Sequence, residues 1–599
     1  MSGIAGIIHF RGNTPSREQA RQLTMGVAHR GVDDKGYFSE GPCCMMHRQF
    51  RSTAGLPAEP VVLDSIVLAM DGEVPKGDAT YVAQQWEKHG PEALNDWGGN
   101  FALAVWDRNL EELWLVRDAA GTRPLFWAHG GGKTAFASEP MPLLGLPWVS
   151  RDVAFENLAE YLSFRYVHAP KTLLKDVSEV PPGHLVRLNA NGAHIERWWT
   201  PRWAAPGTSL PGEKAAAELV DGALKRSVAR SLQRSGPAGI LLSGGLDSTS
   251  ILFHARQEQA GLPVFTVAIA DDPVDEAAFA ARIAKEMESE HHIIRINSDA
   301  IVREIDYCSQ YMGAPLPSAA GLVQSVFYKE IRPMVRTLLS GVGGDEMLAG
   351  RGMQFVAARI RRAQLTATLP RPASRVWRGL ARRAGMHDLA VSPDHFGRDR
   401  SIGGSMVYDA DQRVELFRDP ALVRPGIRQT VLDPLYQEVD TDPINAILHV
   451  RQRGILSQDN LARCDRMAAH QGIEIRYPML DAPFIQQTAA LPGFSKVASK
   501  DIRFLTKWPL RMAMSSRFPG HLLNRPKRLL PNPLDSWLRT AGSGFLSQEI
   551  EALCHEDLGL FLPGAVRSIA AEHLSRLRNH GVRLWTLILL HRWMLQLRP

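Results

Sequence analysis

The stretch "ILLSGGLDSTS" at residues 240–250 joins an apolar run to a Ser-Gly-Gly turn and then to a segment with helical spacing. Adjacent glycines let the backbone turn sharply and point its N–H groups inward, and the start of a helix adds positive partial charge. The stretch therefore predicts a strand, an anion-holding loop and a helix. It is not a Walker loop, because G-x-x-x-x-G-K-[ST] is absent.

A second glycine-rich turn, "LLSGVGGDEMLAG" at 338–350, again follows an apolar run and carries two carboxylates, Asp345 and Glu346. A divalent cation that bridges phosphates needs oxygen ligands from two directions. Asp247 and Asp345 could supply them if their strands are neighbours in a parallel sheet. The two turns together predict a site for ATP with Mg²⁺.

The sequence around these turns divides the chain into two parts. Short apolar runs fill the first part and predict a sheet-rich domain, which we place at residues 1–205. The Pro/Gly-rich "TPRWAAPGTSLPGE" (200–213) marks the boundary. In the second domain, 206–599, strand-like and helical segments alternate and predict a parallel α/β sheet, followed from about residue 353 by a mostly helical part.

Composition limits the function classes. The 599 residues are 45% hydrophobic and 22% charged, which is ordinary for a globular protein. Of the five cysteines, Cys43 and Cys44 are adjacent and the other three are scattered, so they form neither a disulfide framework nor a CxxC pattern. No signal peptide or membrane-spanning run is apparent, so cytoplasm is the expected location. Despite the net charge of +6, basic residues are not interleaved with aromatics on a recognisable module, so we expect no nucleic-acid partner.

These motifs form part of a longer series. Along nearly its whole length the chain resembles the asparagine synthetase B family, in the following ordered stretches: "SGIAGI", "HRGVDDKG" (29–36), "DGEVP" (71–75), "GNFALAVWD" (99–107), "RDAAGTRPLFW" (117–127), "FASEP" (136–140), "PPGHLVRL", "SGGLDS", "SGVGGDE", "CDRMAAHQGIEIRYPMLD" (464–481) and "RPKRLL" (525–530). The resemblance implies an α+β sandwich of the N-terminal-nucleophile, glutaminase-like type. It also implies a following α/β ATP-pyrophosphatase domain of the adenine nucleotide alpha hydrolase-like type, with a helical C-terminal part.

The resemblance also implies the site residues, with ATP and Mg²⁺ as cofactors. Nucleotide binding is assigned to Leu241, Ser243, Gly244, Gly245, Asp247, Ser248, Val267, Gly341 and Gly343. Asp247 and Asp345 are the expected Mg²⁺ ligands. The expected catalytic residues are Asp345, Glu346 and Lys527, with Lys527 neutralising charge on the α-phosphate. Glu346 either orients Asp345 or caps the following helix.

Three departures from the family pattern bear on activity. Ser2 stands where the family's glutaminases have cysteine, and Asp71 in "MDGEVP" stands where they have asparagine. A hydroxyl is a weaker nucleophile, and a carboxylate would repel a developing oxyanion, so we expect the glutaminase to be inactive. A serine amidase is the alternative. Val342 replaces a glutamate that serves the attacking ammonia, which disfavours asparagine synthesis.

Within the family, the departures most resemble lasso-peptide isopeptide-forming cyclases, which are macrolactam synthetases. That resemblance implies an AMP-forming amide ligase that joins an Asp or Glu side chain of a precursor peptide to the N-terminal amine of the core peptide. The expected partners are the precursor peptide and a leader peptidase. The alternatives are an ammonia-dependent amide ligase, a β-lactam synthetase-like cyclase, and a scaffold that only docks a peptide or protein partner.

Overall fold

The N-terminal part is a sandwich of two antiparallel sheets in the computed structural model, which describes residues 2–11, 14–50, 59–233, 236–269, 276–367, 407–422, 426–500, 503–523, 533–555 and 559–598. The first sheet has the order β10-β8-β9-β1-β3-β2 and the second β12-β11-β7-β6-β5-β4. The strands of the first sheet are β1 (Gly3–His9), β2 (Asp34–Glu40), β3 (Cys43–Gln49), β8 (Phe126–Gly130), β9 (Lys133–Ala137) and β10 (Ser178–Glu179). Those of the second are β4 (Val61–Val62), β5 (Ile66–Glu73), β6 (Asn100–Asp107), β7 (Glu112–Arg117), β11 (His184–Asn189) and β12 (Gly192–Arg197).

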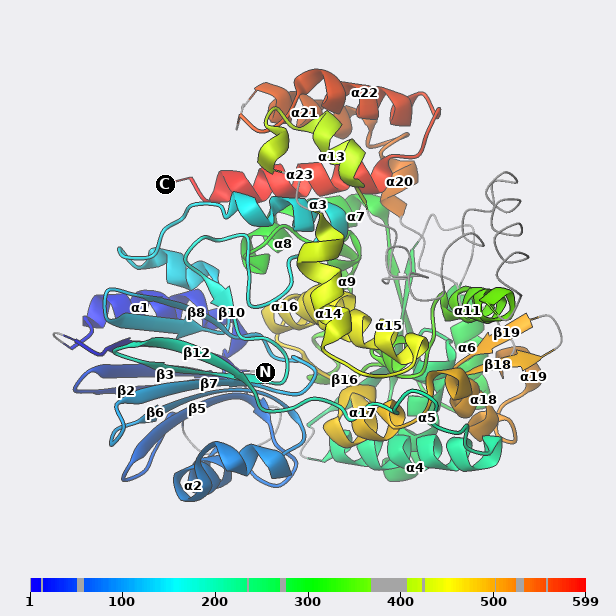
Figure 1. Ribbon diagram of the computed structural model, residues 1–599, viewed down its shortest axis with the longest axis horizontal. Coiled ribbons are helices and arrows are strands. Elements are labelled where there is room, and N and C mark those ends of the chain that lie inside the picture. Colours follow the sequence, from blue (N-terminus) through cyan, green and yellow to red (C-terminus); the bar gives the residue numbers. More distant parts are fainter. Residues whose placement is uncertain are drawn as a thin grey trace.

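Alternation along the strands builds three apolar layers in this domain. Between the sheets, Ile4 and Met45 of the first pack in one cluster with Val67 and Ala102 of the second. Helix α1 (Arg17–Gly26) covers the outer face of the first sheet and α2 (Ala79–His89) that of the second, as Figure 1 shows at the left of the molecule. The predicted α+β sandwich is confirmed.

The second part contains a five-stranded, all-parallel sheet of order β15-β14-β13-β16-β17. Its strands are β13 (Ala238–Leu241), β14 (Val264–Ile269), β15 (His291–Ile296), β16 (Thr337–Leu339) and β17 (Glu474–Arg476). Helix α4 (Glu213–Leu232) precedes β13. The helices between β13 and β16 are α5 (Leu246–Glu258), α6 (Glu276–Glu286), α7 (Ser298–Arg303), α8 (Ile305–Met312) and α9 (Ala320–Ile331). Because β13 and β16 are neighbours, the two glycine-rich turns meet at one edge of the sheet.

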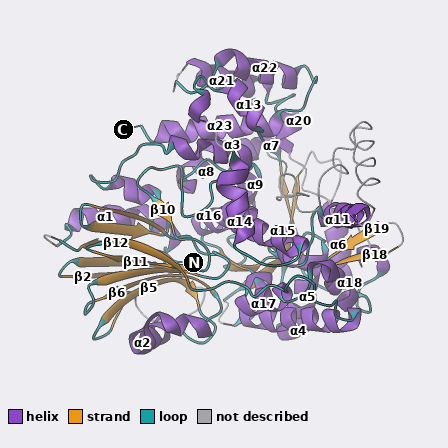
Figure 2. Cartoon of the chain, viewed as in Figure 1, coloured by secondary structure: helices purple, strands orange, loops and turns teal. Residues whose placement is uncertain are grey.

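The rest of the described chain is mainly helical, as predicted, and Figure 2 draws these helices in purple. Its main elements are α11 (Met353–Ala367), α13 (Ala410–Leu416), α14 (Asp433–Gln437), α17 (Ala482–Ala489), α18 (Trp508–Met514), α20 (Pro533–Trp537), α21 (Ser543–His555), α22 (Pro563–Leu574) and α23 (Gly581–Gln596), with a hairpin of β18 (Val497–Lys500) and β19 (Arg503–Thr506). In the described part of the chain, no helix is both long and apolar enough to span a membrane.

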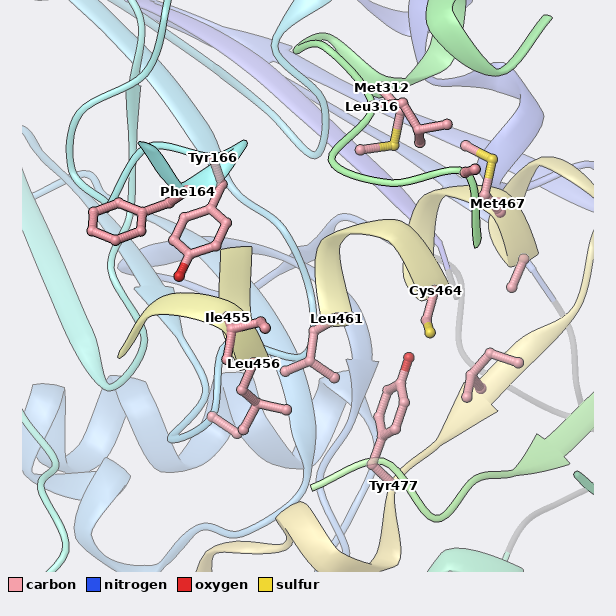
Figure 3. Close-up of a cluster of buried hydrophobic side chains, with 14 of the residues drawn as sticks. Phe164, Tyr166, Met312, Leu316, Ile455, Leu456, Leu461, Cys464, Met467 and Tyr477 are labelled. Atoms are coloured by element: carbon pink, nitrogen blue, oxygen red, sulfur yellow. The ribbon is translucent and has the colours of Figure 1, made fainter. Parts of the chain in front are cut away.

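One helical run connects the two parts of the molecule. Helix α15 (Pro443–Arg451) continues through a ten-residue π-helical segment, η9 (Gln452–Leu461), into α16 (Ala462–His470). π-Helical turns are rare overall, and those that occur often lie at functional sites. Figure 3 shows Leu456 of η9 in the same buried cluster as Phe164 and Tyr166, which lie between strands β9 and β10 of the sandwich. The packing at η9 leaves no room for a side chain at Gly454, where a Cβ atom would lie 2.9 Å from the Tyr166 hydroxyl oxygen.

Candidate active site

The loop after β13 has the shape expected of an anion-binding turn. Gly244 has a left-handed φ of 68°, which a glycine adopts without strain. The Ser248 hydroxyl accepts a hydrogen bond from the Ser243 N–H at 3.2 Å and donates to the Gly245 carbonyl at 3.2 Å. Ser243 is exposed, and α5 begins directly after Gly245. The loop is therefore held open at a helix N-terminus, where backbone N–H groups favour phosphate.

The two glycine-rich turns share one buried cation. The Lys507 ammonium forms ion pairs with Asp247 Oδ2 and, at 2.7 Å, with Asp345 Oδ1. Lys507 is only 4% exposed. Burial by itself would lower the pKa of Lys507, but the charges of Asp247 and Asp345 outweigh it and raise that pKa above its ordinary value. The lysine is therefore charged at neutral pH and holds the two carboxylates together.

This donor set fits Mg²⁺ bound to ATP. Asp247 and Asp345 come from two different turns and point at one positive charge, which is the arrangement that a hard divalent cation needs from oxygen ligands. Both carboxylates pack directly on glycine backbone. A Cβ atom at Gly344 would lie 2.5 Å from Asp247 Cγ, and one at Gly350 would lie 2.0 Å from Asp345 Oδ1. The glycines of these turns thus set the position of the carboxylates.

This packing yields a prediction for Gly344→Ala. The added methyl group must displace the Asp247 carboxylate, and a shift of about 1 Å at a reacting centre can cost about 100-fold in rate. We expect AMP release to fall by about that factor while the melting temperature changes little. Gly130→Ala is the matched control, because its Cβ would meet nothing within 4 Å. Equal activity of the two variants would contradict the assignment.

Further polar groups surround Glu346, which is 7% exposed and lies in the first turn of α10 (Gly344–Met347). The Gln452 side-chain amide donates to the Glu346 carbonyl at 3.3 Å. Burial lowers the pKa of Arg451, while the charges of Glu346 and Asp345 oppose that effect, so this arginine lies close to both carboxylates. The guanidinium of Arg451 is fixed by the Arg351 carbonyl at 2.8 Å. The first residues of η9 and the end of α15 therefore support the catalytic turn.

The structure brings most of the predicted site residues together. Leu241 ends β13, Val267 lies on the neighbouring β14, and Gly343 turns with a left-handed φ of 100°. A Cβ at Gly341 would lie 3.1 Å from both Asp247 Cβ and the Ser248 nitrogen, so the two turns touch here. Lys527 lies outside the described residues.

Sequence reasoning missed Lys507, the buried cation of the site. It sits in "TKWPLR", directly before α18, with a left-handed φ of 57°. Its only local signal is its place at the start of a helix with proline at the second position, which also occurs in many surface turns. Nothing in that pattern indicates a contact with a residue 260 positions earlier.

In the N-terminal site, the Asp71 carboxylate binds both Ser2 and Arg30. The Ser2 backbone N–H donates to Asp71 Oδ1 at 2.7 Å, and Arg30 donates to Asp71 Oδ2 at 3.0 Å. The Arg30 Nε group also donates to the Ser2 carbonyl at 3.1 Å. A buried carboxylate thus stands at the position of the expected amide donor and accepts a hydrogen bond from the Ser2 N–H.

The same arginine reaches into the second domain. Arg30 Nη1 donates to Asp465 Oδ2 on α16 at 2.8 Å. Arg123, which lies between β7 and β8, donates to Asp465 Oδ1 at 3.2 Å and to Glu474 Oε1 on β17 at 3.2 Å. These groups are 4% exposed or less. Arginines of the sandwich therefore neutralise buried carboxylates of the synthetase sheet and its neighbouring helix.

The fold and site define a two-domain protein in which an amidotransferase-type sandwich precedes an ATP-pyrophosphatase-like domain. A family profile described as "Asparagine synthase" matches residues 219–595, and a "Glutamine amidotransferase domain" profile matches residues 68–199. The chain therefore belongs to the asparagine synthase family, whose members are ATP-dependent, amide-forming ligases that use ATP with Mg²⁺.

Curated relatives agree with this assignment over most of the chain. A "Putative asparagine synthetase [glutamine-hydrolyzing]" of Mycobacterium bovis is 28% identical over 86% of this chain and 79% of its own length. "Asparagine synthetase [glutamine-hydrolyzing] 1" of Bacillus subtilis is 24% identical over 99% of this chain and 96% of its own. Among solved structures, glutamine phosphoribosylpyrophosphate amidotransferase of B. subtilis covers 57% of this chain and 81% of its own at 15% identity, with a TM-score of 0.25.

Proposed function

We propose that this ligase is a macrolactam synthetase whose amine arrives on the substrate and not as ammonia. The observation that carries the proposal is the bonding of Asp71 in the N-terminal site. Its carboxylate accepts hydrogen bonds from Arg30 and from the Ser2 N–H. A negatively charged carboxylate held there repels the oxyanion that glutamine hydrolysis would form. Val342, which is partly buried against the core, adds an apolar side chain where the family handles ammonia.

The proposed substrate is a precursor peptide of the lasso type. The side-chain carboxylate of an Asp or Glu attacks the α-phosphorus of ATP, and pyrophosphate leaves. The free N-terminal amine of the core peptide then attacks the acyl carbon, AMP leaves, and the nitrogen loses a proton. A leader peptidase supplies that amine by removing the leader segment.

In this proposal the protein's own residues neutralise charge and hold the reacting groups in position. The loop 243–248 binds the pyrophosphate through backbone N–H groups, and Asp247 and Asp345 hold the magnesium. Lys507 balances the two carboxylates and the charge that develops near them, a role that suits a compact ammonium. Holding amine and acyl carbon together supplies several kcal/mol of the barrier reduction by proximity, about 7 or more in favourable cases.

The test is AMP and pyrophosphate release from MgATP by the full chain. One reaction contains aspartate with ammonium, and another contains a candidate precursor peptide with its peptidase. We expect AMP and pyrophosphate release with the peptide only. The product should be lighter than the core peptide by one water molecule. Turnover with aspartate and ammonium that yields asparagine would overturn it.

The names of the relatives favour a second candidate, an asparagine synthetase-like ligase. Because the glutaminase centre carries Asp71, that candidate would depend on free ammonia. A protein that binds no MgATP at all would instead revive the view that the chain only docks a partner.

A separate prediction concerns glutamine. We expect the wild-type protein to release no glutamate from glutamine above the background of the buffer, because the Asp71 carboxylate opposes the oxyanion. A coupled glutamate dehydrogenase assay measures this directly. Glutamate release that disappears in the Ser2→Ala variant would show a working serine amidase and would contradict the prediction.

A further inference from the structure

A hollow of about 430 Å³, part of it open solvent, lies where the sandwich, the interdomain linker and the helical run α15–η9 meet. Arg197 at the end of β12 lines it from one side, Trp199 of the linker from another, and His449 and Arg453 of the helical run from a third. The site described above does not use this hollow.

The hollow adjoins the catalytic turn. Met347 lines it and comes directly after Glu346. Gln452 also lines it and donates to the Glu346 carbonyl at 3.3 Å and to Met347 Sδ at 3.6 Å. A group bound in the hollow would therefore lie next to the turn that carries Asp345.

Positive charge exceeds negative charge at this place. Arg197 Nη2 lies 2.6 Å, and Arg453 Nε 3.7 Å, from the same oxygen of Glu438, Oε2. Within the described part of the chain, Glu438 is the carboxylate that these two guanidinium groups share. Burial raises the pKa of Glu438, but the hydrogen bond from His449 and the charge of Arg453 outweigh it and hold the pKa at about 2, so Glu438 is ionised.

The histidines beside the hollow add no lasting charge. Burial lowers the pKa of His449, and burial with the charge of Arg453 lowers that of His184 to about 4, so both rings are neutral at pH 7. The charge of the nearby Arg117 is met by Glu179, with which it forms a buried ion pair. Two guanidinium groups thus share one carboxylate where all three side chains are partly buried. An unbalanced charge in such a place raises the free energy of the folded protein.

We infer that this hollow is a binding subsite for a second carboxylate of the substrate, distinct from the carboxylate that reacts with ATP. The Arg197 and Arg453 guanidinium groups would hold the carboxylate through charge-assisted hydrogen bonds. The apolar wall of Trp199, Leu456 and Met347 would take the carbon body that bears it. That the carboxylate belongs to a peptide rests on the proposed function, whereas the subsite itself does not.

The test measures binding to the full-length protein without nucleotide, by calorimetry. The probe is N-acetyl-leucine, which bears a carboxylate on an apolar body, and its uncharged counterpart is N-acetyl-leucinamide. We expect the acid to bind at least ten times more tightly than the amide. Arg197→Gln should weaken binding of the acid about tenfold. Glu438→Gln should strengthen that binding, because the Glu438 carboxylate, which competes with the acid for the two arginines, loses its charge.

Arg187→Gln is the matched control, since Arg187 is an exposed arginine on the adjacent strand β11 and should leave the affinity unchanged. Equal binding of acid and amide, or equal effects of the two arginine variants, would overturn the inference. Displacement of the acid by inorganic phosphate at equal affinity would overturn the carboxylate assignment. Because the assay contains neither ATP nor precursor peptide, its failure and a failure of the macrolactam proposal are separate results.

Discussion

Lys507→Met is expected to lower AMP and pyrophosphate release by at least about 100-fold, the usual scale for removing one electrostatic group from a reacting centre. The substitution keeps most of the apolar stem of the side chain but removes the charge that Asp247 and Asp345 share. Two buried carboxylates without a cation repel each other, so we also expect the free energy of unfolding to fall by about 3 kcal/mol. A quenched-flow or steady-state AMP assay and urea denaturation measure the two effects.

Magnesium gives a readout that does not depend on turnover. In the wild type the ion must compete with the Lys507 ammonium for the same two carboxylates, whereas in Lys507→Met those carboxylates lack their cation. Added MgCl₂ should therefore raise the melting temperature of the variant more than that of the wild type. Lys175→Met is the control, because Lys175 is 61% exposed and its 3.9 Å ion pair with Asp152 lies at the surface. Identical magnesium responses would contradict this assignment.

Arg30→Met is expected to destabilise the whole chain by about 3–5 kcal/mol, the range for removing one partner from a buried ion pair. Arg30 is 1% exposed and contacts three carboxylates, those of Asp71, Glu139 and Asp465. Asp71 and Glu139 belong to the sandwich and Asp465 to α16, so both domains lose a counter-charge at once. Urea denaturation followed by tryptophan fluorescence would measure the loss.

The exposed Arg21 on α1 supplies the control, and Arg21→Met should change the free energy of unfolding by less than about 0.5 kcal/mol. The Arg30 result also bears on the role of the sandwich. If Arg30→Met proved as stable as Arg21→Met, the interdomain charges would not hold the two domains together, and a structural role for the N-terminal site would lose its basis.

Much of the architecture could be predicted from local sequence. The glycine-rich turns, the alternation of strands and helices after residue 213 and the short strands before residue 200 each reflect the conformation of a few neighbouring residues. Even the pairing of Asp247 with Asp345 followed from the rule that neighbouring parallel strands end at one edge of the sheet. The departures at Ser2 and Asp71 rest instead on the resemblance to the asparagine synthetase B family.

The partners of the buried charges could not be predicted. Lys507 meets Asp247 across 260 residues, and Arg30 meets Asp465 across 435. Lys527 was assigned to the site by resemblance and lies outside the described residues, whereas Lys507, which no local pattern singled out, lies between the two carboxylates. The interdomain hollow beside Met347 likewise has no linear signal, because its walls come from three separate segments.

The sequence by itself determined the two-domain plan, the anion loop and the presence of paired carboxylates, because these depend on backbone preferences and spacing within short windows. Only the tertiary structure decided which cations neutralise those carboxylates and how the sandwich is joined to the synthetase sheet. A charge that folding removes from water must find a counter-charge within a few ångströms. That counter-charge is supplied by whichever distant segment the packing of the whole chain brings there.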